Sequence, residues 1–317
     1  MKKVIKIFSL LFIALLLLMG ISYIYSTAGM EAMNNEVRTS LNKEFVKLKH
    51  GAIHYGWNGP IDGEVVVMIH GFSTPRFVFM KNVGALADAG YRVLTYDHYG
   101  RGYSDRPTVD YDKTLYDEAL LELLDELKIE EPVNLVGYSM GGGIATVFAG
   151  NHPERVKRVV LMAPIGFIPE QRGINSLLSF PIIGNWVMTV IGKNALIKEF
   201  ENHVANGHAP QEMADRFREQ FQYAGVEQAL ASSIRNYPMS NMVTEYQQLG
   251  NTKMPKLMIW GAKDTVCPIT GADDITRLIP SFQLFTIEDG KHEIAYSHAD
   301  IVNGALIDFF SKKNQRK

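Results

Sequence analysis

The chain has 317 residues, and its 32 Lys and Arg against 34 Asp and Glu give a formal net charge of −2. This balance argues against a nucleic-acid-binding protein, which usually carries a clear basic excess. Hydrophobic residues make up 46% of the chain and charged residues 21%, as in an ordinary globular protein. The single cysteine, Cys267, excludes an intramolecular disulfide and a cysteine-rich metal site.

The N-terminal segment is apolar and long enough to cross a membrane. Few polar residues interrupt residues 7–24, and a helix of this length spans about 27 Å. Lysines precede the run, so an anchor would leave the rest of the chain outside the cytoplasm. Small residues ending at Ala28 also fit a signal peptide cleaved after Ala28, which would give a secreted or periplasmic protein. Residues 1–28 are therefore predicted to be a membrane anchor or a signal peptide.

Strand and helix patterns alternate after a polar stretch, residues 29–42, that predicts a linker. Continuous apolar runs such as Val65–Ile69 are typical of strands buried on both faces of a parallel sheet. The order of elements predicts an α/β fold, with a mostly parallel central sheet flanked by helices. Strands are expected at 45–49, 53–57, 64–70, 91–96, 133–137 and 156–162, and helices at 77–89, 114–127 and 140–151.

The alternation stops near Ala163, and no clear strand pattern follows until about residue 250. Strands then return at 256–260 and 282–287, with helices at 269–278 and 297–310. The sequence thus predicts a core formed by residues 43–163 and 251–317, and a helical cap formed by residues 164–250.

An uncharged apolar segment, Ile174–Ile191, lies inside the predicted cap. One interpretation is that this segment forms the packed interior of the cap. The other is that it forms a lid that receives an acyl chain and touches the bilayer.

The motif G-x-S-x-G lies between a predicted strand and a predicted helix, with Ser139 at its centre. A strand–turn–helix with glycine on both sides of the serine is the context that a nucleophile elbow requires. The alternative is a glycine-rich turn without chemistry. The context favours Ser139 as a nucleophile exposed at the end of a strand.

The chain resembles the α/β-hydrolase superfamily, of the serine-hydrolase kind with a helical cap, such as esterases and monoacylglycerol lipases. The resemblance covers roughly residues 45–312. His70-Gly71-Phe72 is similar to the family's oxyanion loop, and the match implies that the backbone N–H groups of Phe72 and Met140 form the oxyanion hole. His70 is then expected to brace this loop.

A second loop, which begins at Asp97 and continues Asp-His-Tyr-Gly-Arg-Gly-Tyr-Ser, resembles the family pattern D-x-x-G-x-G-x-S. In that pattern the aspartate and the arginine, here Asp97 and Arg101, brace the floor of the active site. This resemblance gives Asp97 a structural role and leaves the triad acid to be found elsewhere.

The family order places the triad acid and then the histidine after the nucleophile, which implies Asp264 and His292. Asp264 follows a buried strand, and His292 follows the last strand. His292 would take the proton of Ser139, and Asp264 would orient the imidazole. Other acids in this region are rival candidates: Asp273, Asp274, Glu288, Asp289 and Glu293.

The remaining chemistry-bearing residues predict no metal site, because no paired His and acidic spacing is present, and no cofactor is expected. His203 and His208 lie in the predicted cap, where solvent exposure is expected and contact with substrate is the alternative. Cys267, close to Asp264, is expected to be a small packing residue.

The nucleophile and its neighbours narrow the function. A serine disfavours the epoxide hydrolases and haloalkane dehalogenases of this fold, which use aspartate. Hydrolases that cleave carbon–carbon bonds in ring-fission products share the S-M-G-G run. They commonly have tryptophan after the histidine, where this chain has Glu293. Cofactor-free haloperoxidases also use this triad.

The predicted function is hydrolysis of carboxylic esters, of lipid or medium-chain acyl groups, through an acyl-enzyme. Carbon–carbon bond hydrolysis and a catalytically silent binding protein are the alternatives. The expected partners are a small-molecule ester or lipid and, through the N-terminal segment, a membrane; the oligomeric state is open.

Overall fold

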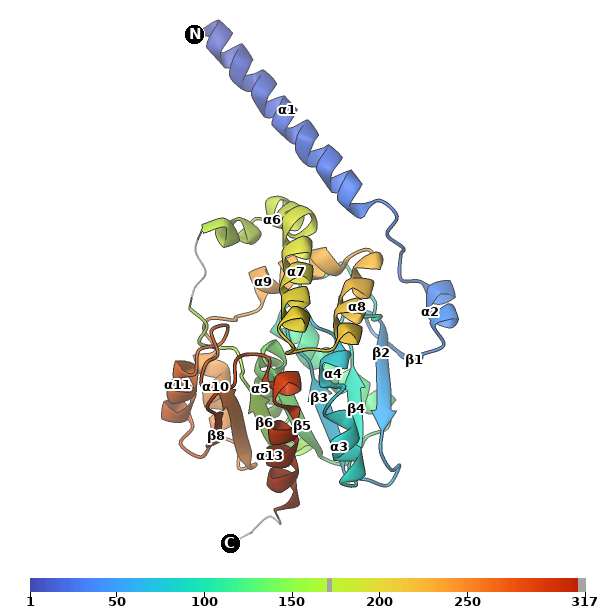
Figure 1. The fold of residues 1–317 in the computed structure, drawn as a ribbon, viewed down its shortest axis with the longest axis vertical. Helices are drawn as coiled ribbons and strands as arrows, with labels where there is room; N and C mark the ends of the chain where they lie inside the picture. The colour runs from blue at the N-terminus through green and yellow to red at the C-terminus, as the bar shows by residue number, and fades with distance from the viewer. Residues whose placement is uncertain (170–172, 313–317) are drawn as a thin grey trace.

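An eight-stranded sheet forms the core of the computed structural model, which describes residues 1–169 and 173–312 (Figure 1). The strand order is β1-β2-β4-β3-β5-β6-β7-β8. Only β2 runs against the others in this sheet. The predicted mostly parallel α/β fold is therefore confirmed. The strands are β1 (Glu44–Leu48), β2 (Gly51–Asn58), β3 (Val65–Ile69), β4 (Arg92–Tyr96), β5 (Val133–Tyr138), β6 (Val156–Met162), β7 (Lys256–Gly261) and β8 (Gln283–Ile287).

The centre of the sheet is apolar on both faces. Every residue of β5 and of β7 is buried, as expected for parallel strands that are covered by helices on both sides. This rigid centre ends, at its carboxyl edge, in the loops that carry Ser139 and Asp264.

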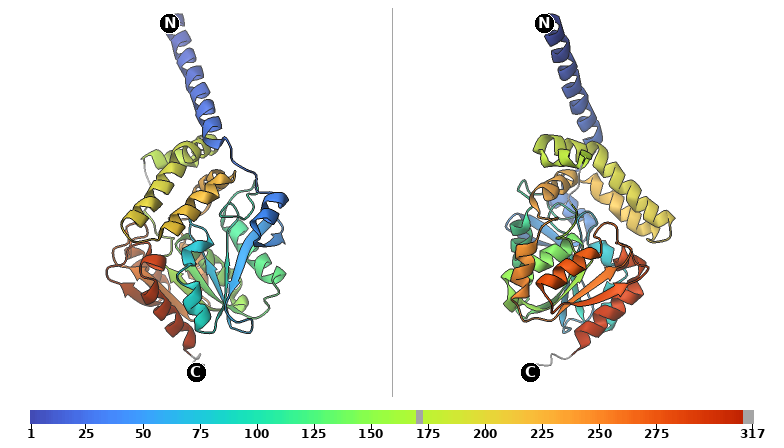
Figure 2. Two further views of the ribbon diagram at one scale, coloured as in Figure 1. Left: turned by 45° about the vertical axis from the view of Figure 1, so that its right-hand side comes forward. Right: turned by 90° about the vertical axis from the view of Figure 1, so that its left-hand side faces the viewer.

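Helices cover both faces of the sheet (Figure 2). α3 (Val83–Asp88) packs against α13 (Ala299–Ser311). A second layer is continuous through contacts of α5 with α4 and α10, and of α10 with α11. Its helices are α4 (Lys113–Glu126), α5 (Met140–Asn151), α10 (Val243–Gly250) and α11 (Thr270–Leu278). α10 belongs to the predicted cap but packs on α5, so the structure places the end of that segment on the core.

The helix predicted at 77–89 is interrupted. A short 3₁₀ helix, η1 (Arg76–Phe79), is followed by a turn, and α3 begins at Val83. In the turn, the backbone N–H of Asn82 donates to the Phe79 carbonyl at 2.8 Å, a 3₁₀-type bond. The buried side chain of Asn82 donates to Asn303 Oδ1 of α13 at 2.8 Å. Because this buried amide needs a partner, its bond to α13 fixes the turn.

The helix predicted at 297–310 corresponds to α13, and a separate short helix, α12 (Ile294–Ser297), precedes it. One further short 3₁₀ helix, η2 (Pro153–Arg155), joins α5 to β6.

The insertion between β6 and β7 is helical, and its described residues, 164–169 and 173–250, contain no strand. It covers the carboxyl edge of the sheet in Figure 1. Residues 170–172 of the predicted cap, and 313–317 of the predicted core, lie outside the described residues. Before α10 the cap consists of η3 (Gly173–Ser179), α6 (Pro181–Val187), the π-helical turn η4 (Met188–Gly192), α7 (Lys193–Ala205), α8 (Gln211–Glu219), η5 (Gln220–Gln222) and α9 (Val226–Asn236).

The N-terminal helix α1 (Lys2–Thr27) extends away from the cap (Figures 1 and 2). It is long and apolar enough to cross a membrane; its most apolar stretch has a mean hydropathy of 2.7 and is not buried. Only its carboxyl end contacts the cap. The Trp186 indole N–H lies 3.0 Å from the Met19 carbonyl, and Lys193 Nζ donates to the Ser26 carbonyl at 2.9 Å.

Residues 29–42 differ from the expected linker, because they contain the short helix α2 (Asn35–Leu41) and are attached to the rest of the molecule. Arg38 of α2 forms an ion pair with Asp105 of the core. The backbone N–H of Glu31 donates to the Gln222 carbonyl of the cap at 2.8 Å. These contacts fix the direction in which α1 leaves the folded domain.

Candidate active site

The loops that follow β5, β7 and β8 meet at the carboxyl edge of the sheet. Ser139 comes directly after β5, Asp264 follows β7 by three residues, and His292 follows β8. Parallel strands end at the same edge, and this edge is where ligand sites of open α/β sheets form. The three residues therefore come from distant parts of the sequence to one place.

The turn that carries Ser139 is strained. Ser139 has φ +55° and ψ −120°, a conformation that a residue with a side chain rarely adopts. A Cβ at position 137 would lie 2.3 Å from the Gly141 carbonyl oxygen, and one at position 141 would lie 2.0 Å from that of Ile69. Only glycine fits at both positions, so the motif is what permits the sharp turn.

Ser139, His292 and Asp264 form a continuous hydrogen-bonded chain. Ser139 Oγ lies 3.0 Å from His292 Nε2, and His292 Nδ1 lies 2.8 Å from Asp264 Oδ2. A carboxylate only accepts, so Nδ1 carries the ring proton and Nε2 is free to accept from the serine hydroxyl. This is the arrangement in which a serine can transfer its proton as it attacks.

The buried Asp264 carboxylate is held from its other side by backbone groups. Its Oδ1 accepts from the N–H groups of Val266 and Cys267, each at 2.8 Å. The carboxylate thus keeps one orientation toward the histidine. The rival acids Asp273, Asp274, Glu288, Asp289 and Glu293 make no hydrogen bond to the imidazole among the described contacts.

The two residues of the predicted oxyanion hole belong to the turn that carries Ser139 and to the loop after β3. Met140 is the first residue of α5, so its N–H has no carbonyl one turn earlier in the helix to pair with. The loop after β3 approaches Ser139 closely, and a Cβ at Gly71 would lie 3.2 Å from the serine Cβ. Arg101 Nε donates to the Phe72 carbonyl at 2.6 Å, which fixes the orientation of that loop.

His70 braces the same loop, as the resemblance implies. Its Nε2 accepts from the His98 N–H at 2.9 Å, and its Nδ1 donates to the Gly71 carbonyl at 2.9 Å. Burial lowers the pKa of His70 to about 4, so the ring is neutral at pH 7. A neutral ring is what these two bonds need, since one nitrogen accepts and the other donates.

The Asp97 carboxylate accepts hydrogen bonds from three separate segments near the site. It accepts from the Arg76 N–H at 2.9 Å, from the Tyr103 N–H at 3.1 Å and from His54 Nδ1 at 2.6 Å. Burial alone would raise the pKa of the Asp97 carboxyl, but the neighbouring His54 holds this pKa well below its usual range. The carboxylate is fully engaged in these contacts, in keeping with a structural role.

Arg101 connects the core to the cap. It is completely buried, and besides the Phe72 carbonyl it donates to Ser233 Oγ of α9 at 2.9 Å. The same guanidinium lies over the Phe72 ring, 5.5 Å from its centroid. The orientation of the loop that carries Phe72 is therefore coupled to a cap helix through one side chain.

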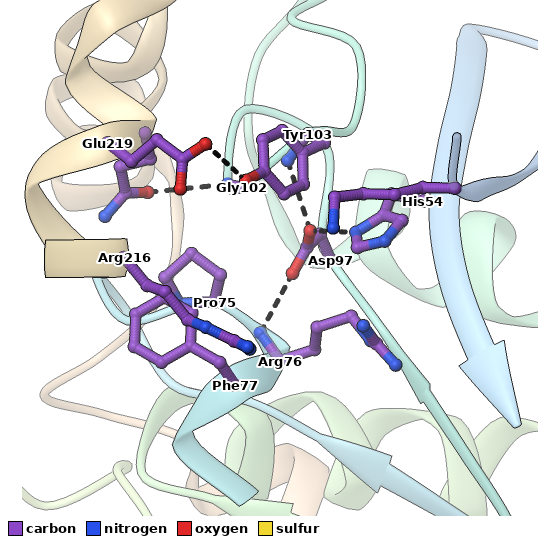
Figure 3. Close-up of a pocket in the computed structure, with 11 residues that line it drawn as sticks. His54, Pro75, Arg76, Phe77, Asp97, Gly102, Tyr103, Arg216 and Glu219 are labelled. Carbon is purple, nitrogen blue, oxygen red and sulfur yellow. Dashed lines mark hydrogen bonds and ion pairs between the residues drawn. The ribbon is translucent and has the colours of Figure 1, made fainter. Parts of the chain in front are cut away.

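A polar cavity of about 240 Å³ lies between the cap and the Asp97 network (Figure 3). It is lined by His54, Arg76 and Asp97 of the core, and by Arg216 and Glu219 of α8. It does not include the three residues of the hydrogen-bonded chain.

Two contacts near His292 and Ser139 are not indicated by any motif in the sequence. The hydroxyl of Tyr138 donates to the His292 carbonyl at 2.9 Å and so holds the histidine loop against the nucleophile turn. Burial raises the pKa of Cys267, which lies beside Ser139, so the thiol stays protonated and poorly nucleophilic. Cys267 is 2% exposed, consistent with the packing role predicted for it.

His203 and His208 are not simple solvent-exposed residues. Both are half-buried, and both contact Glu293, the residue after His292. The expectation of exposure is wrong here, because the end of α7 folds over the histidine loop.

The chain belongs to the α/β-hydrolase fold family, whose model matches residues 64–299. A Synechocystis protein named for non-heme chloroperoxidase activity is 30% identical over 258 residues, 78% of this chain and 91% of that protein. A 2-hydroxy-6-oxononadienedioate/2-hydroxy-6-oxononatrienedioate hydrolase of Pseudomonas putida is 29% identical, over 87% of this chain and 99% of that protein. The solved enol-lactonase of Burkholderia xenovorans has a TM-score of 0.72 at 21% identity, covering 85% of this chain and all of that one.

Proposed function

We propose that the protein is a serine hydrolase of carboxylic esters that acts on lipid or medium-chain acyl groups at a membrane surface. The catalytic part of this proposal rests on the hydrogen bonds that link Ser139 to His292, at 3.0 Å, and His292 to Asp264, at 2.8 Å. Ser139 is the nucleophile, His292 the base and Asp264 the residue that orients it.

In the acylation step, Ser139 Oγ attacks the ester carbonyl carbon while His292 Nε2 takes the hydroxyl proton. The negative charge that develops on the carbonyl oxygen is stabilised by the backbone N–H groups of Phe72 and Met140. His292 then gives its proton to the leaving alkoxide, and the bond between the carbonyl carbon and the alcohol oxygen breaks. An acyl group stays on Ser139, and an alcohol leaves.

In the deacylation step, water takes the place of the alcohol. His292 removes a proton from the water as its oxygen attacks the acyl carbon. The bond to Ser139 Oγ then breaks, Oγ regains a proton from His292, and a carboxylic acid is released. The same two N–H groups stabilise the second tetrahedral intermediate.

The cap surface supports a lipid-derived substrate. Large apolar side chains are exposed where the cap meets the base of α1: Leu177, Phe180, Ile182, Ile183 and Ile191. If α1 crosses a bilayer, this surface lies at the membrane face. The contacts of Trp186 and Lys193 with the carboxyl end of α1 favour an anchor retained in the mature protein over a segment cleaved after Ala28. The lysines before α1 would then place the hydrolase domain outside the cytoplasm.

A second candidate function, carbon–carbon bond hydrolysis, is favoured by the relatives named for it, which reach 29% identity over nearly their whole length. It would use the same residues on a dienoate substrate. A haloperoxidase-type reaction is favoured by the relative from Synechocystis. The N-terminal helix and the apolar cap surface fit a lipid ester better than they fit the substrates of these two reactions.

The test compares substrate classes on the full-length protein in detergent or vesicles. We expect kcat/KM for p-nitrophenyl esters to rise with acyl length and to exceed that for ring-fission dienoates by at least about a hundredfold, with a burst of alcohol before the steady state. A higher kcat/KM for dienoates would replace the ester proposal by carbon–carbon hydrolysis. Inactivity on both classes, with no burst, would favour a silent binding protein.

A further inference from the structure

Two histidines of the cap and one glutamate of the core form a cluster that the ester mechanism does not use. The ligand-capable atoms of His203, His208 and Glu293 all lie within 4.8 Å of one another. His208 Nδ1 is 3.1 Å and His203 Nδ1 is 3.8 Å from Glu293 Oε1. Two imidazoles and one carboxylate, with a fourth position left for water, are a donor set that suits zinc.

The pairing of the two histidines is built into the end of α7. Beyond the helix, Gly207 has φ +73° and turns the chain back. The N–H of His208 then donates to the His203 carbonyl at 2.9 Å, and that of Gly207 to the Val204 carbonyl at 2.9 Å. These are the two bonds of a Schellman motif. The two positions that usually make an apolar contact across this motif are here both histidine, and their ring centroids are 6.2 Å apart.

Glu293 supplies the third group from the opposite side. Its side chain is only 7% exposed, and its carboxylate meets both cap histidines. A buried carboxylate needs compensation by positive charge or good donors, since its desolvation is costly.

The surroundings favour a cation. The cluster lies at the carboxyl end of α7, where the helix dipole is negative. The His203 and His208 side chains are 27% and 33% exposed, so an ion can reach them from solvent. Ligand atoms around a tetrahedral zinc ion lie about 3.4 Å apart, so small rotations of the two rings would bring all three into place.

We propose that His203, His208 and Glu293 bind a zinc ion that fastens the cap to the loop carrying His292. The three residues come from two segments nearly ninety positions apart, which is why no sequence motif marks the site. The ion takes no part in the ester reaction. Because Glu293 is adjacent to His292, binding fixes the position of the base and holds α7 over the site.

The experiment measures metal binding by the full-length, tag-free protein in detergent. The protein is first treated with a chelator and then titrated with ZnCl₂, with bound zinc measured by elemental analysis and Tm by calorimetry. We expect about one zinc ion per chain and a Tm increase of several degrees. Co²⁺ in place of zinc should show the visible absorption of a tetrahedral site.

The variants His208→Ala and Glu293→Gln should each lose stoichiometric zinc binding and the zinc-dependent rise in Tm. His298→Gln is the matched control, because His298 is a nearby half-buried histidine that pairs with Asp289 at 3.4 Å; it should bind zinc as the unchanged protein does. Folding of each variant is checked by its Tm in chelator, which should match that of the unchanged protein in chelator.

Zinc binding that persists in both variants, or no stoichiometric binding by the unchanged protein, would overturn the proposal and leave a histidine–glutamate ion pair. This readout does not depend on ester hydrolysis. A failure of the zinc site and a failure of the proposed function can therefore be told apart.

Discussion

The carboxyl edge of the sheet and the cap that covers it are built in different ways. At the sheet edge, buried strands end in loops whose polar groups are paired with one another, as in the contacts of His70, Asp97 and Asp264. The cap is a helical insertion that exposes large apolar side chains and touches α1. On the proposed function, the core holds the reacting residues and the cap governs how a substrate reaches them.

Two of the residues that connect these regions lie next to the loops of the candidate site. Arg101 joins the Phe72 loop to α9, and Glu293 joins the histidine loop to the end of α7. Changes at the sheet edge should therefore alter the reaction with every substrate, whereas changes on the cap surface should alter only the use of membrane-bound substrates.

The largest effect is expected from Asp264→Asn. An amide at this position can hold His292 in the wrong tautomer, so that Nε2 carries the proton and cannot accept from Ser139. We expect kcat for a soluble p-nitrophenyl ester to fall by about 10⁴-fold. Asp274→Asn, on the surface of α11 where Asp274 pairs with Arg277 at 2.7 Å, should retain full activity. Equal activity of both variants would show that Asp264 is not the orienting acid.

Gly141→Ala tests the close approach at the nucleophile turn. The added Cβ would lie 2.0 Å from the Ile69 carbonyl oxygen and 2.5 Å from that of His70, so backbone must move. We expect unfolding free energy to fall by about 3 kcal/mol in denaturant titrations. Gly84→Ala in α3 meets nothing within 4 Å and should be neutral or stabilising by up to about 1 kcal/mol. A tolerated alanine at 141 would contradict the account of this turn.

Acid should lower the unfolding free energy through His70, which braces the loop after β3. Its folded pKa of about 4 lies below the ordinary value of 6.5, so the unfolded chain binds a proton more readily. The resulting stability is complete above pH 6.5 and is lost as pH falls toward 4, by about 3 kcal/mol. The buried neighbour His98, whose pKa burial also lowers, acts in the same direction. Unfolding free energy measured from pH 7 to 4 should fall less steeply in His70→Asn; an unchanged slope would exclude His70 as the source.

The smallest effect is expected on the cap surface. Ile182 of α6 is 84% exposed, and Ile61, in the loop between β2 and β3, is 81% exposed. Ile182→Ser should lower kcat/KM for an ester presented in vesicles by about fivefold, because apolar area is lost from the membrane contact. Activity on a soluble ester should be unchanged, and Ile61→Ser should change neither. If the two variants have equal activity on vesicles, the cap surface does not contact the membrane.

What the sequence could predict depends on whether a feature arises from patterns in the sequence or from contacts between distant segments. Strand runs and the glycine motif around Ser139 follow from local patterns, whereas Asp264 and His292 follow from the resemblance to the α/β hydrolases. In the structure, His292 lies within hydrogen-bonding distance of both Ser139 and Asp264. Their catalytic roles stay predictions. The break at Asn82 and the attachment of residues 29–42 could not be predicted, because both depend on contacts with distant segments. The contacts of Glu293 with two cap histidines are of the same kind.

The most direct test of the central claim is covalent labelling of Ser139. The full-length protein in detergent is treated with a fluorophosphonate probe, and the labelled peptide is identified by mass spectrometry. We predict stoichiometric labelling at Ser139, none in Ser139→Ala, and full labelling in Ser40→Ala, which removes a surface hydroxyl of α2. Labelling that persists in Ser139→Ala, or that maps to another residue of the unchanged protein, would contradict the account.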